Sequence, residues 1–462
     1  MKLFLPPPVT LAVSVVLAAA PIAAQAPVRE GAIHRASLDN GLQVFVVENH
    51  TVPLATVLVA VHNGAMTQEP RDRGLAHLFE HMLFRSYKGE PTAFAQEATY
   101  LDGQFNGTTS EEVVTYYLVL PAKNVLKGIA LLAQLVQKPR FNAHELDEEQ
   151  SVVLDELQRD ESDPEQSLAR RSAQQLWGPS WSRKDVGGDS GSLKGISLER
   201  LQQTYAHYYV PNNAALMVTG DVSSADVLSA ARQEFGPWSR APDPFGERPV
   251  PPVAELTASA VTLMAQPVLH ALITVQFRGP SIAQDTLATY AADALCDVLN
   301  ERGSPFQRHL VDGALFQSVH CTYAPLAHVG PFTIQARTTP AKASAALTVL
   351  LSELDQLHRL AGVSDENLAI AGKRRRVQSA LTLEANATLA PSLAFWWASG
   401  GIDYYEHYDE HVNEQRLEDL RRFAETYIVG RPKVIAVLAP AGVIERLRAA
   451  LGQAGRNPGS PP

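Results

Sequence analysis

Residues 73–84 read Arg73-Gly-Leu-Ala-His-Leu-Phe-Glu-His-Met-Leu-Phe84, and the interpretation of the whole chain starts from this stretch. On a helix, His77 and His81 are one turn apart and share a face. Neutral imidazole is the commonest metal ligand, so this pair forms half of a zinc site. Glu80 points to the same face, where a carboxylate can take a proton from water. The order His-x-x-Glu-His therefore predicts metal-assisted hydrolysis, most often of peptides.

The surroundings of this motif are apolar. The predicted helix has a buried side formed by Leu75, Leu78, Phe79, Met82, Leu83 and Phe84. Buried imidazole and carboxylate groups need partners, and a metal ion is one such partner. The alternative is a pair of surface histidines on a solvated helix.

A second predicted helix offers a third ligand. Residues 141–160 are amphipathic, and the Asp163-Pro164 step ends the helix. Its apolar side is marked by Leu146, Val152, Val153 and Leu157. Glu149 and Glu156 are two turns apart on one face, so one could bind zinc while the other supports the site from behind. Spacing alone does not choose between them, because the segment is rich in acidic residues.

Together, these two segments resemble the pitrilysin/insulinase family of zinc peptidases with the inverted His-x-x-Glu-His motif. The resemblance is closest to the half-length branch that includes the beta subunit of the mitochondrial processing peptidase. It implies a LuxS/MPP-like metallohydrolase fold that holds one Zn²⁺ per chain. It also implies that His77, His81 and Glu156 bind the metal and that Glu80 is the general base. Glu149 would be needed for catalysis without touching the metal.

The first 26 residues are interpreted as a secretory signal peptide. Lys2 precedes an apolar stretch at 9–20, and Ala24-Gln25-Ala26 offers a cleavage site, with a cut after Ala20 or Ala24 as the alternative. The apolar stretch is too short for a stable membrane span, although an uncleaved anchor is the alternative. We therefore expect a chain that is periplasmic in a Gram-negative source, or secreted.

The charge and cysteine content limit the partners and leave one question open. The net charge is −10, and the basic cluster Lys373-Arg-Arg-Arg376 is interpreted as a solvated helix face, so no nucleic-acid partner is expected. The two cysteines, Cys296 and Cys321, are either a disulfide or two buried free thiols.

The chain repeats itself at a long offset. Residues 207–222 and 426–441 share one pattern, which pairs Tyr208 with Tyr427 at an offset of 427 − 208 = 219. Each segment is a helix end, a turn, a buried strand, a turn and a helix. The strands predicted at 55–64 and 271–279 match as well. A single long offset indicates a duplicated domain rather than a solenoid.

We therefore predict an α+β fold of two similar domains, each a mostly antiparallel sheet with packed helices. The predicted segments are a signal peptide at 1–26, a zinc-bearing domain at 27–235, a Pro-rich linker at 236–252, a second domain at 253–452 and a disordered tail at 453–462. The second domain has no His-x-x-Glu-His, and its helix at 286–300 is predicted to be structural, closing a chamber over the metal.

Residues 105–120 follow a Gly/Asn turn, alternate in polarity and are predicted to form one strand. By the resemblance, this strand lies at a sheet edge near the zinc, where an extended peptide can add through backbone hydrogen bonds. The predicted substrate-binding residues are Phe105, Asn106, Gly107 and Thr108. Gly107 stands where the family more usually has Ala. The alternative is an ordinary strand with a polar turn.

The sequence departs from the family pattern at one important point. By the resemblance, active members use an Arg and a Tyr from the second type of domain to hold the substrate and the oxyanion. Val311 and Phe316-Gln317 stand at those positions here, while Arg308 and Tyr323 are out of register. A peptidase without such donors loses orders of magnitude in rate. We therefore expect a homologous partner without the zinc motif to supply the pair, or a homodimer.

The sequence thus predicts an exported zinc endopeptidase that cuts short or unfolded peptides as the zinc-bearing subunit of a heterodimer. One alternative is a non-catalytic peptide-binding or scaffold subunit that keeps the fold. Another is a hydrolase of a non-peptide amide.

Overall fold

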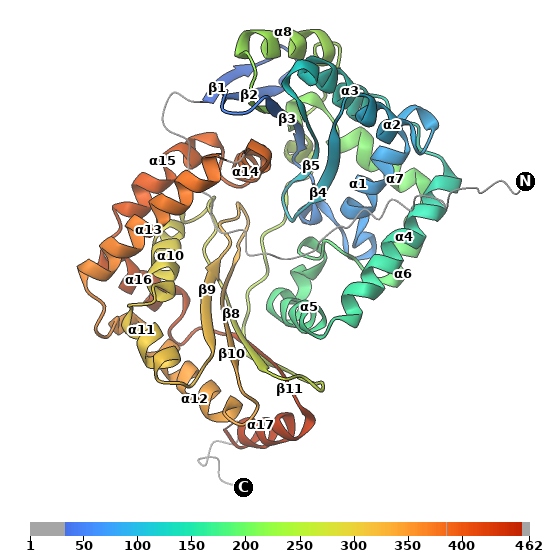
Figure 1. Cartoon of the computed structure of the whole chain (residues 1–462). Coiled ribbons are helices and arrows are strands. Elements are labelled where there is room, and N and C mark those ends of the chain that lie inside the picture. The colour runs from blue at the N-terminus through green and yellow to red at the C-terminus, as the bar shows by residue number, and fades with distance from the viewer. Residues whose placement is uncertain (1–32, 385, 455–462) are drawn as a thin grey trace, which may run out of the picture.

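The computed structural model describes residues 33–384 and 386–454, which form two sheets with helices packed on them (Figure 1). The signal peptide predicted at 1–26 lies outside the described residues, as do residues 455–462 of the predicted tail. The last helix reaches Ala454, so the first two residues of that tail are helical.

The first sheet has six strands in the order β1-β2-β6-β3-β5-β4, and only β2 and β6 run parallel. The strands are β1 (Ile33–Ser37), β2 (Gln43–Glu48), β3 (Leu54–Val61), β4 (Gln104–Thr109), β5 (Val114–Pro121) and β6 (Ala214–Gly220). The central strands β3 and β6 are buried along nearly their whole length. Both faces of this sheet are therefore covered, as their continuous apolar sequences require.

The helices of this first half lie between and after its strands. They are α1 (Leu75–Arg85), α2 (Ala93–Tyr100), α3 (Val125–Gln137), α4 (Ala143–Ser162), α5 (Pro164–Trp177), α6 (Ser190–Gly195), α7 (Leu198–Tyr208) and α8 (Ser224–Phe235). One face of the sheet packs on α1, α3 and α8. Alternate residues of β3 point into that core, where Val57 and Val59 meet Leu78 and Leu132.

The second sheet repeats this order with one strand fewer, β7-β11-β8-β10-β9, and again one pair, β7 and β11, is parallel. Its strands are β7 (Ala260–Ala265), β8 (Ala271–Arg278), β9 (Ser318–Tyr323), β10 (Pro331–Thr338) and β11 (Val434–Ala439). The predicted α+β fold of two similar, mostly antiparallel domains is thereby confirmed.

The remaining helices belong to the linker and the second half. The short helix α9 (Pro244–Glu247) lies within the predicted Pro-rich linker. The others are α10 (Thr286–Asn300), α11 (Pro305–Gln307), α12 (Ala343–Asp355), α13 (Asp365–Glu384), α14 (Asn386–Ser399), α15 (Ile402–Asn413), α16 (Leu417–Tyr427) and α17 (Ala441–Ala454). Short turns of 3₁₀ type lie at Ala65–Thr67, Pro70–Asp72, Tyr87–Gly89, Ala122–Asn124, Gly178–Arg183, Pro211–Asn213 and Leu357–Arg359, and a π turn lies at Arg308–Asp312.

Each half lends a helix to the sheet of the other half. Helix α14 packs on β3 and β6 of the first sheet, and α5 packs on β7, β8 and β11 of the second (Figure 1). The indole of Trp397 on α14 also donates a hydrogen bond to Gln43 on β2 (3.0 Å). On the other side, Leu168 of α5 is buried against Leu272 and Leu438. The two halves are therefore held together by apolar cores that each contain residues of both.

A polar contact ties the first sheet to the second half near the end of β4. The carboxylate of Glu112 accepts hydrogen bonds from the backbone N–H groups of Ala327 and His328 (2.9 and 2.8 Å). The ammonium of Lys184 donates to Glu111 and to the Val329 carbonyl (2.5 and 2.8 Å). The turn that follows β4 is thus anchored in the second half.

The prediction of one strand over residues 105–120 is wrong. The structure has an antiparallel hairpin of β4 and β5 with a turn at 110–113. The hydroxyl of Ser110 accepts hydrogen bonds from the N–H groups of Glu112 and Val113, which stabilises this turn. Residues 107–112 contain no apolar side chain, and this polar run was the sign of a break that the sequence analysis did not use.

Candidate metal centre

Helix α1 presents its motif side chains to the interior. Gly74 precedes the helix at a φ of 84°, in the left-handed region that favours glycine. One side of the helix packs into the core through Leu75, Leu78, Phe79, Met82 and Leu83. The side chains of His77, Glu80 and His81 are buried too, with residue exposures of 2%, 3% and 8%. The two histidines are therefore not surface groups.

Helix α4 runs alongside α1 and brings two buried carboxylates to it. Its first turn is capped by Asn142, whose side-chain oxygen accepts the Glu145 N–H (2.9 Å). Its apolar stripe consists of Leu146, Val153 and Leu157. Val152, predicted on that stripe, is 42% exposed, because it lies one residue and about 100° away from the buried face. Glu149 and Glu156 are buried and face α1.

Three of the predicted site residues converge on one point. One possible ligand atom from each of His77, His81 and Glu156 lies within 4.8 Å of the others. The carboxylate oxygen of Glu156 is 3.9 Å from Nε2 of His77 and 3.6 Å from Nε2 of His81. The two imidazole rings stand nearly perpendicular, with centroids 4.8 Å apart.

The polar atoms at this point have no hydrogen-bond partners among the described residues. These atoms are both ring nitrogens of His77, Nε2 of His81 and Oε2 of Glu156. A buried polar atom without a partner is costly, and native proteins nearly always supply one. Two imidazole nitrogens and a carboxylate oxygen match the donor set of a catalytic zinc site, which keeps a fourth position for water. The residues present therefore fit a zinc ion.

Glu149 acts from behind this cluster. Its carboxylate lies 3.0 Å from Nδ1 of His81 and 3.2 Å from Nε of Arg85. In the tautomer with the proton on Nδ1, His81 donates a hydrogen bond to Glu149, and its Nε2 has a free lone pair for a metal. The structure thus separates the two acidic residues that spacing alone could not, since Glu156 faces both histidines and Glu149 faces only the far side of one.

Glu80 lies beside the cluster and is directed to the edge strand β4. Its Oε2 accepts a hydrogen bond from the hydroxyl of Thr109 (2.7 Å). A Cβ added to Gly107 would lie only 2.6 Å from Oε1 of Glu80, so β4 touches the carboxylate directly. Glu80 therefore lies next to the three candidate ligands, but its carboxylate is directed to β4 and it is not a fourth candidate ligand.

The burial of this site shifts the pKa values of its groups. Burial lowers the pKa of His77 to about 3, and the nearby His81 adds to the effect. His77 is therefore a neutral imidazole at physiological pH, the form that binds metals. Burial also lowers the pKa of His81, but the hydrogen bond with Glu149 and the surrounding carboxylates raise it above its usual value overall. Burial raises the pKa of Glu80 to about 7.

The residues predicted to bind substrate do not all face the same way. Strand β4 is the edge of the sheet, as expected. The ring of Phe105 packs on Phe84 and Phe94 in the core, with centroids 5.2 and 5.1 Å away. Gly107 shares that face of the strand, while Asn106 and Thr108 point to the other one. Thr109, which contacts Glu80, was missed by the sequence analysis, although its spacing of two from Gly107 places it on the same face.

Three of the residues considered in the second half as its Arg and Tyr offer no donor to this site. Phe316 is buried in the core of the second half, and Val311 packs against it. The hydroxyl of Tyr323 donates to the carbonyl of Pro280 (3.0 Å) within that half. The absence of a suitable pair in the sequence is therefore matched by the positions of these side chains.

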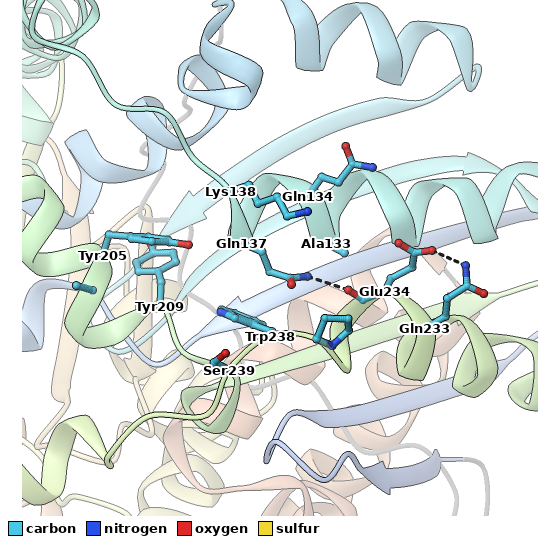
Figure 2. A pocket seen from close by; sticks show the side chains of 12 residues that line it. Ala133, Gln134, Gln137, Lys138, Tyr205, Tyr209, Gln233, Glu234, Trp238 and Ser239 are labelled. Carbon is cyan, nitrogen blue, oxygen red and sulfur yellow. Dashed lines mark hydrogen bonds between the residues drawn. The ribbon is translucent and has the colours of Figure 1, made fainter.

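An open hollow of about 550 Å³ lies between α3, α7 and the segment after α8 (Figure 2). It is lined by Gln134, Gln137, Tyr205, Tyr209 and Trp238, among others. Tyr209 packs against Phe79 of α1, with ring centroids 4.3 Å apart. None of the lining residues belongs to the histidine and glutamate cluster, so this hollow is separate from the candidate site.

Within residues 33–384 and 386–454, no helix is long and apolar enough to cross a membrane.

Comparisons with curated proteins point to zinc proteases. The chain is 25% identical over 246 residues to a probable mitochondrial-processing peptidase subunit beta of Arabidopsis thaliana. That match covers 53% of this chain and 46% of the relative, so the chain spans about half the length of that protein. It is also 25% identical over 452 residues to an uncharacterized zinc protease of Mycobacterium tuberculosis, covering 94% of this chain and 98% of the relative.

Solved structures share the fold. A protease from Helicobacter pylori superposes with a TM-score of 0.76 at 21% identity, covering 88% of this chain and 99% of that one. The periplasmic protease PqqL from Escherichia coli gives a TM-score of 0.75 at 16% identity, covering 94% of this chain and 51% of that one.

Both halves of the chain match one peptidase family. Residues 43–179, which include α1 and most of the sheet beside it, match Insulinase (Peptidase family M16). Residues 195–373 match the Peptidase M16 inactive domain. The order of an active-type half followed by an inactive-type half agrees with the single His-x-x-Glu-His on α1. This chain belongs to the insulinase family of peptidases, M16.

Proposed function

We propose that this protein is an exported zinc endopeptidase that hydrolyses short or unfolded peptides. The observation that carries the proposal is the convergence of His77, His81 and Glu156 beside the Glu80 carboxylate. Four buried polar atoms of these three residues lack partners in the part of the chain that the structure describes. The family and the relatives named as zinc proteases support the same chemistry.

In this proposal the chain's residues divide the work. His77, His81 and Glu156 hold one zinc ion, and Glu149 orients His81 through Nδ1. When bound, zinc supplies Lewis-acid chemistry, lowering the pKa of a water and polarising a carbonyl. Glu80 takes the proton of the attacking water and delivers it to the leaving amine.

The edge of β4 is the proposed docking site for the peptide. Strand β4 pairs in the sheet with β5 alone, so its outer edge can pair with an extended chain once the Gly107 N–H is released from the side chain of Asn106 (2.9 Å). Backbone pairing is indifferent to side chains, which suits a peptidase for varied sequences. Asn106 and Thr108 are the proposed polar contacts. Phe105 contributes indirectly, since its ring supports the strand from the core.

We further propose that the active species contains a second, homologous chain. The residues Val311 and Phe316 offer no hydrogen-bonding side chain for an oxyanion, and the hydroxyl of Tyr323 is engaged with Pro280. A partner lacking the zinc motif would supply the missing Arg and Tyr. A homodimer is the simpler version of the same proposal.

The disulfide between Cys296 and Cys321 supports the proposed export, because such bonds persist in oxidising compartments. A periplasmic or secreted location also follows from the signal peptide predicted at 1–26.

The experiment is a pull-down of the tagged, exported chain from its native host, followed by hydrolysis of a quenched unstructured peptide. We expect Glu80→Gln to keep its zinc and to lower turnover by roughly 10²- to 10⁴-fold, because the general base is lost. Glu161→Gln is the matched control, since Glu161 is an exposed acid on α4. The proteins that co-purify reveal whether a partner is required.

Two outcomes would contradict the proposal. Loss of zinc from Glu80→Gln would show that Glu80 is a ligand rather than a base. Equal turnover by the wild type and Glu80→Gln would favour the peptide-binding or scaffold alternative.

A further inference from the structure

The hydrogen-bond registers of the two sheets allow them to be matched residue by residue. Val57 on β3 and Ile273 on β8 both point into the core of their own half. When these two residues are superposed, their cross-strand partners correspond as well. The resulting pairs are Val218 with Val437, Leu118 with Ala336 and, one strand further out, Phe105 with Val319. The offset 437 − 218 = 219 is the one that relates Tyr208 to Tyr427 in the sequence repeat.

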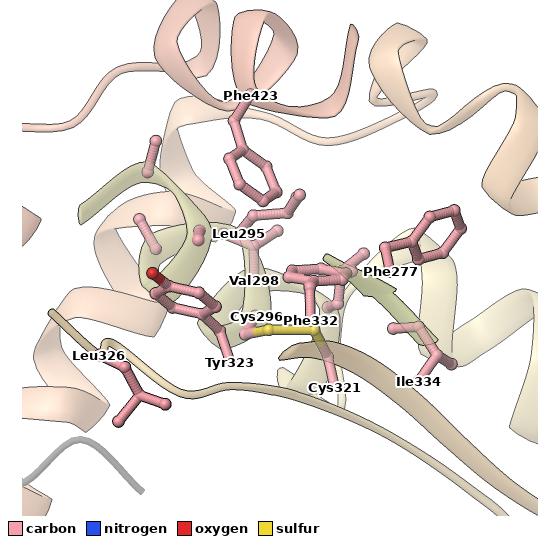
Figure 3. Close-up of a cluster of buried hydrophobic side chains, with 14 of the residues drawn as sticks. Phe277, Leu295, Cys296, Val298, Cys321, Tyr323, Leu326, Phe332, Ile334 and Phe423 are labelled. Atoms are coloured by element: carbon pink, nitrogen blue, oxygen red, sulfur yellow. A yellow bond between two sulfur atoms is a disulfide. The ribbon is translucent and has the colours of Figure 1, made fainter. Parts of the chain in front are cut away.

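Two residues further along the edge strands, this match pairs Gly107 on β4 with Cys321 on β9. In the first half, the position of a Cβ on Gly107 would touch the carboxylate of Glu80 on α1. In the second half, Cys321 is joined by a disulfide to Cys296 on α10 (Figure 3). Cys296 therefore occupies on its helix the place that Glu80 occupies on α1.

The correspondence of Glu80 with Cys296 aligns the motif on α1 with a segment of α10. His77-Leu-Phe-Glu80-His81 corresponds to Asp293-Ala-Leu-Cys296-Asp297. Each histidine has a carboxylate as its counterpart, and the general base has a cysteine. The counterparts of the two histidines keep their spacing of four residues, so both carboxylates lie on one face of α10.

A cation from the neighbouring helix fills the space between these carboxylates. Helix α13 packs on α10 as α4 packs on α1. Its Arg375 donates from Nε to Asp297 (2.5 Å) and from Nη1 to the hydroxyl of Tyr408 (3.0 Å), and that hydroxyl donates to Asp293 (2.5 Å). Asp293, Arg375 and Tyr408 are buried, at 4%, 9% and 0% exposure.

We propose that the second half contains a converted copy of the metal site, in which the guanidinium of Arg375 and the Cys296–Cys321 disulfide replace a metal ion. The guanidinium bridges α10 to α13 and to α15, which carries Tyr408. The disulfide ties α10 to the edge strand β9, where the first half has the contact between Glu80 and β4. The cation is part of the chain, so it cannot be lost to a chelator.

Charge considerations agree with this assignment. A buried guanidinium requires carboxylate partners, and removal of one member of such a group leaves an uncompensated charge. Burial raises the pKa of Asp293 to about 7, which brings the cluster of one guanidinium and two carboxyl groups closer to neutrality. The chain is accordingly expected to bind one metal ion rather than two.

The match between the halves does not depend on the proposed function. Only the comparison of Arg375 with a metal rests on the candidate site of the first half. The test therefore addresses the two halves separately, by hydrogen–deuterium exchange on the full chain with a chelator, with a reductant, with both or with neither, and by measuring bound zinc.

We expect the reductant to increase exchange at least tenfold in α10 and β9 while leaving α1 and α4 unchanged. We expect the chelator to increase exchange in α1 and α4 while leaving α10 and β9 unchanged. Arg375→Met should increase exchange in α10, α13 and α15, and Arg375→Met combined with Asp297→Asn should do so less, because the buried charge is removed with its partner. Lys373→Met is the matched control, since Lys373 is an exposed cation on the same helix. If Arg375→Met does not fold, the reductant experiment on the wild type still tests the disulfide, and Arg375→Lys, which keeps the charge, tests the cation.

Two zinc ions per chain would overturn the proposal. Exchange in α10 and β9 that is insensitive to the reductant would also overturn it. Equal exchange in α10 for Lys373→Met and the Arg375 variants would do the same. A chain that binds no zinc at all would contradict the proposed function and leave the reductant and arginine results to decide this inference.

Discussion

At the scale of single residues, the site depends on groups that do not face the metal position. Glu149 contacts His81 only through Nδ1, on the side away from Glu156. Its carboxylate fixes both the tautomer and the orientation of the ring. Glu149 is therefore expected to affect affinity for the metal rather than the chemical step.

We expect Glu149→Gln to weaken zinc binding by roughly 10- to 100-fold while the fold is retained, because an amide is a poorer acceptor for the Nδ1 proton. Competition with a chromophoric chelator measures this affinity, and circular dichroism monitors the fold. Glu161→Gln should bind zinc like the wild type. Unchanged affinity in Glu149→Gln would mean that the contact with His81 does not matter for the metal.

Thr109 holds Glu80 by one hydrogen bond (2.7 Å), and its replacement by Val keeps the shape of the side chain. Loss of a bond worth about 1 kcal/mol should lower kcat roughly fivefold, because the general base is less well placed. KM and zinc content should stay the same. Gln104→Leu is the control, since Gln104 is an exposed residue of the same strand. An equal loss of kcat in both variants would point to a general effect on β4.

At the scale of elements, α4 carries two site residues on a helix whose first turn depends on Asn142. The side chain of Asn142 caps the N–H of Glu145 (2.9 Å). Asn142→Ala should lower the free energy of unfolding by about 1 kcal/mol, and Asn142→Asp should not, because Asp caps equally well. Chemical denaturation of the three proteins gives the values. Equal stability of the Ala and Asp variants would show that the cap is not needed.

The elements also show what a sequence can and cannot predict. Helices α1 and α4 were predictable because apolar residues recur at helical spacing along each of them, and α10 was predictable because it is rich in Ala and Leu. The turn at 110–113 was missed, although the polar run at 107–112 interrupts the alternation of the two strands. The contact between Glu80 and Thr109 depends on how α1 packs on the edge strand, which no local pattern specifies. The pairing of Cys296 with Cys321 stayed open for the same reason, since it joins a helix to a strand.

At the scale of the whole molecule, His62 lies where the two halves meet. Its ring is 3.8 Å from that of Trp397 on α14, and its Nε2 is buried without a partner among the described residues. Burial lowers the pKa of His62 to about 4, partly offset by Glu112. In the unfolded chain the imidazole of His62 is protonated as the pH falls below about 6.5, whereas in the folded chain it stays neutral until about pH 4. Stability is therefore complete above the unfolded value and is lost as the pH falls toward 4.

We expect His62→Phe, which keeps an aromatic ring against Trp397, to lose less stability than the wild type between pH 7 and pH 5, by about 2 kcal/mol. Urea denaturation at both pH values measures the difference. His144→Gln is the control, because His144 is an exposed histidine on α4. Parallel losses in the wild type and His62→Phe would show that His62 is not the group responsible.

The exchange of α5 and α14 between the sheets has a consequence for how this chain can be cut. A protease that nicks the backbone within 236–252 would separate the two sequences without separating the two cores, since each core contains a helix from the other fragment. The fragments should migrate as one particle on a sizing column and part only in denaturant. Expressed singly, either fragment would present an uncovered apolar sheet face to water and should aggregate, whereas the two synthesised together should reassemble.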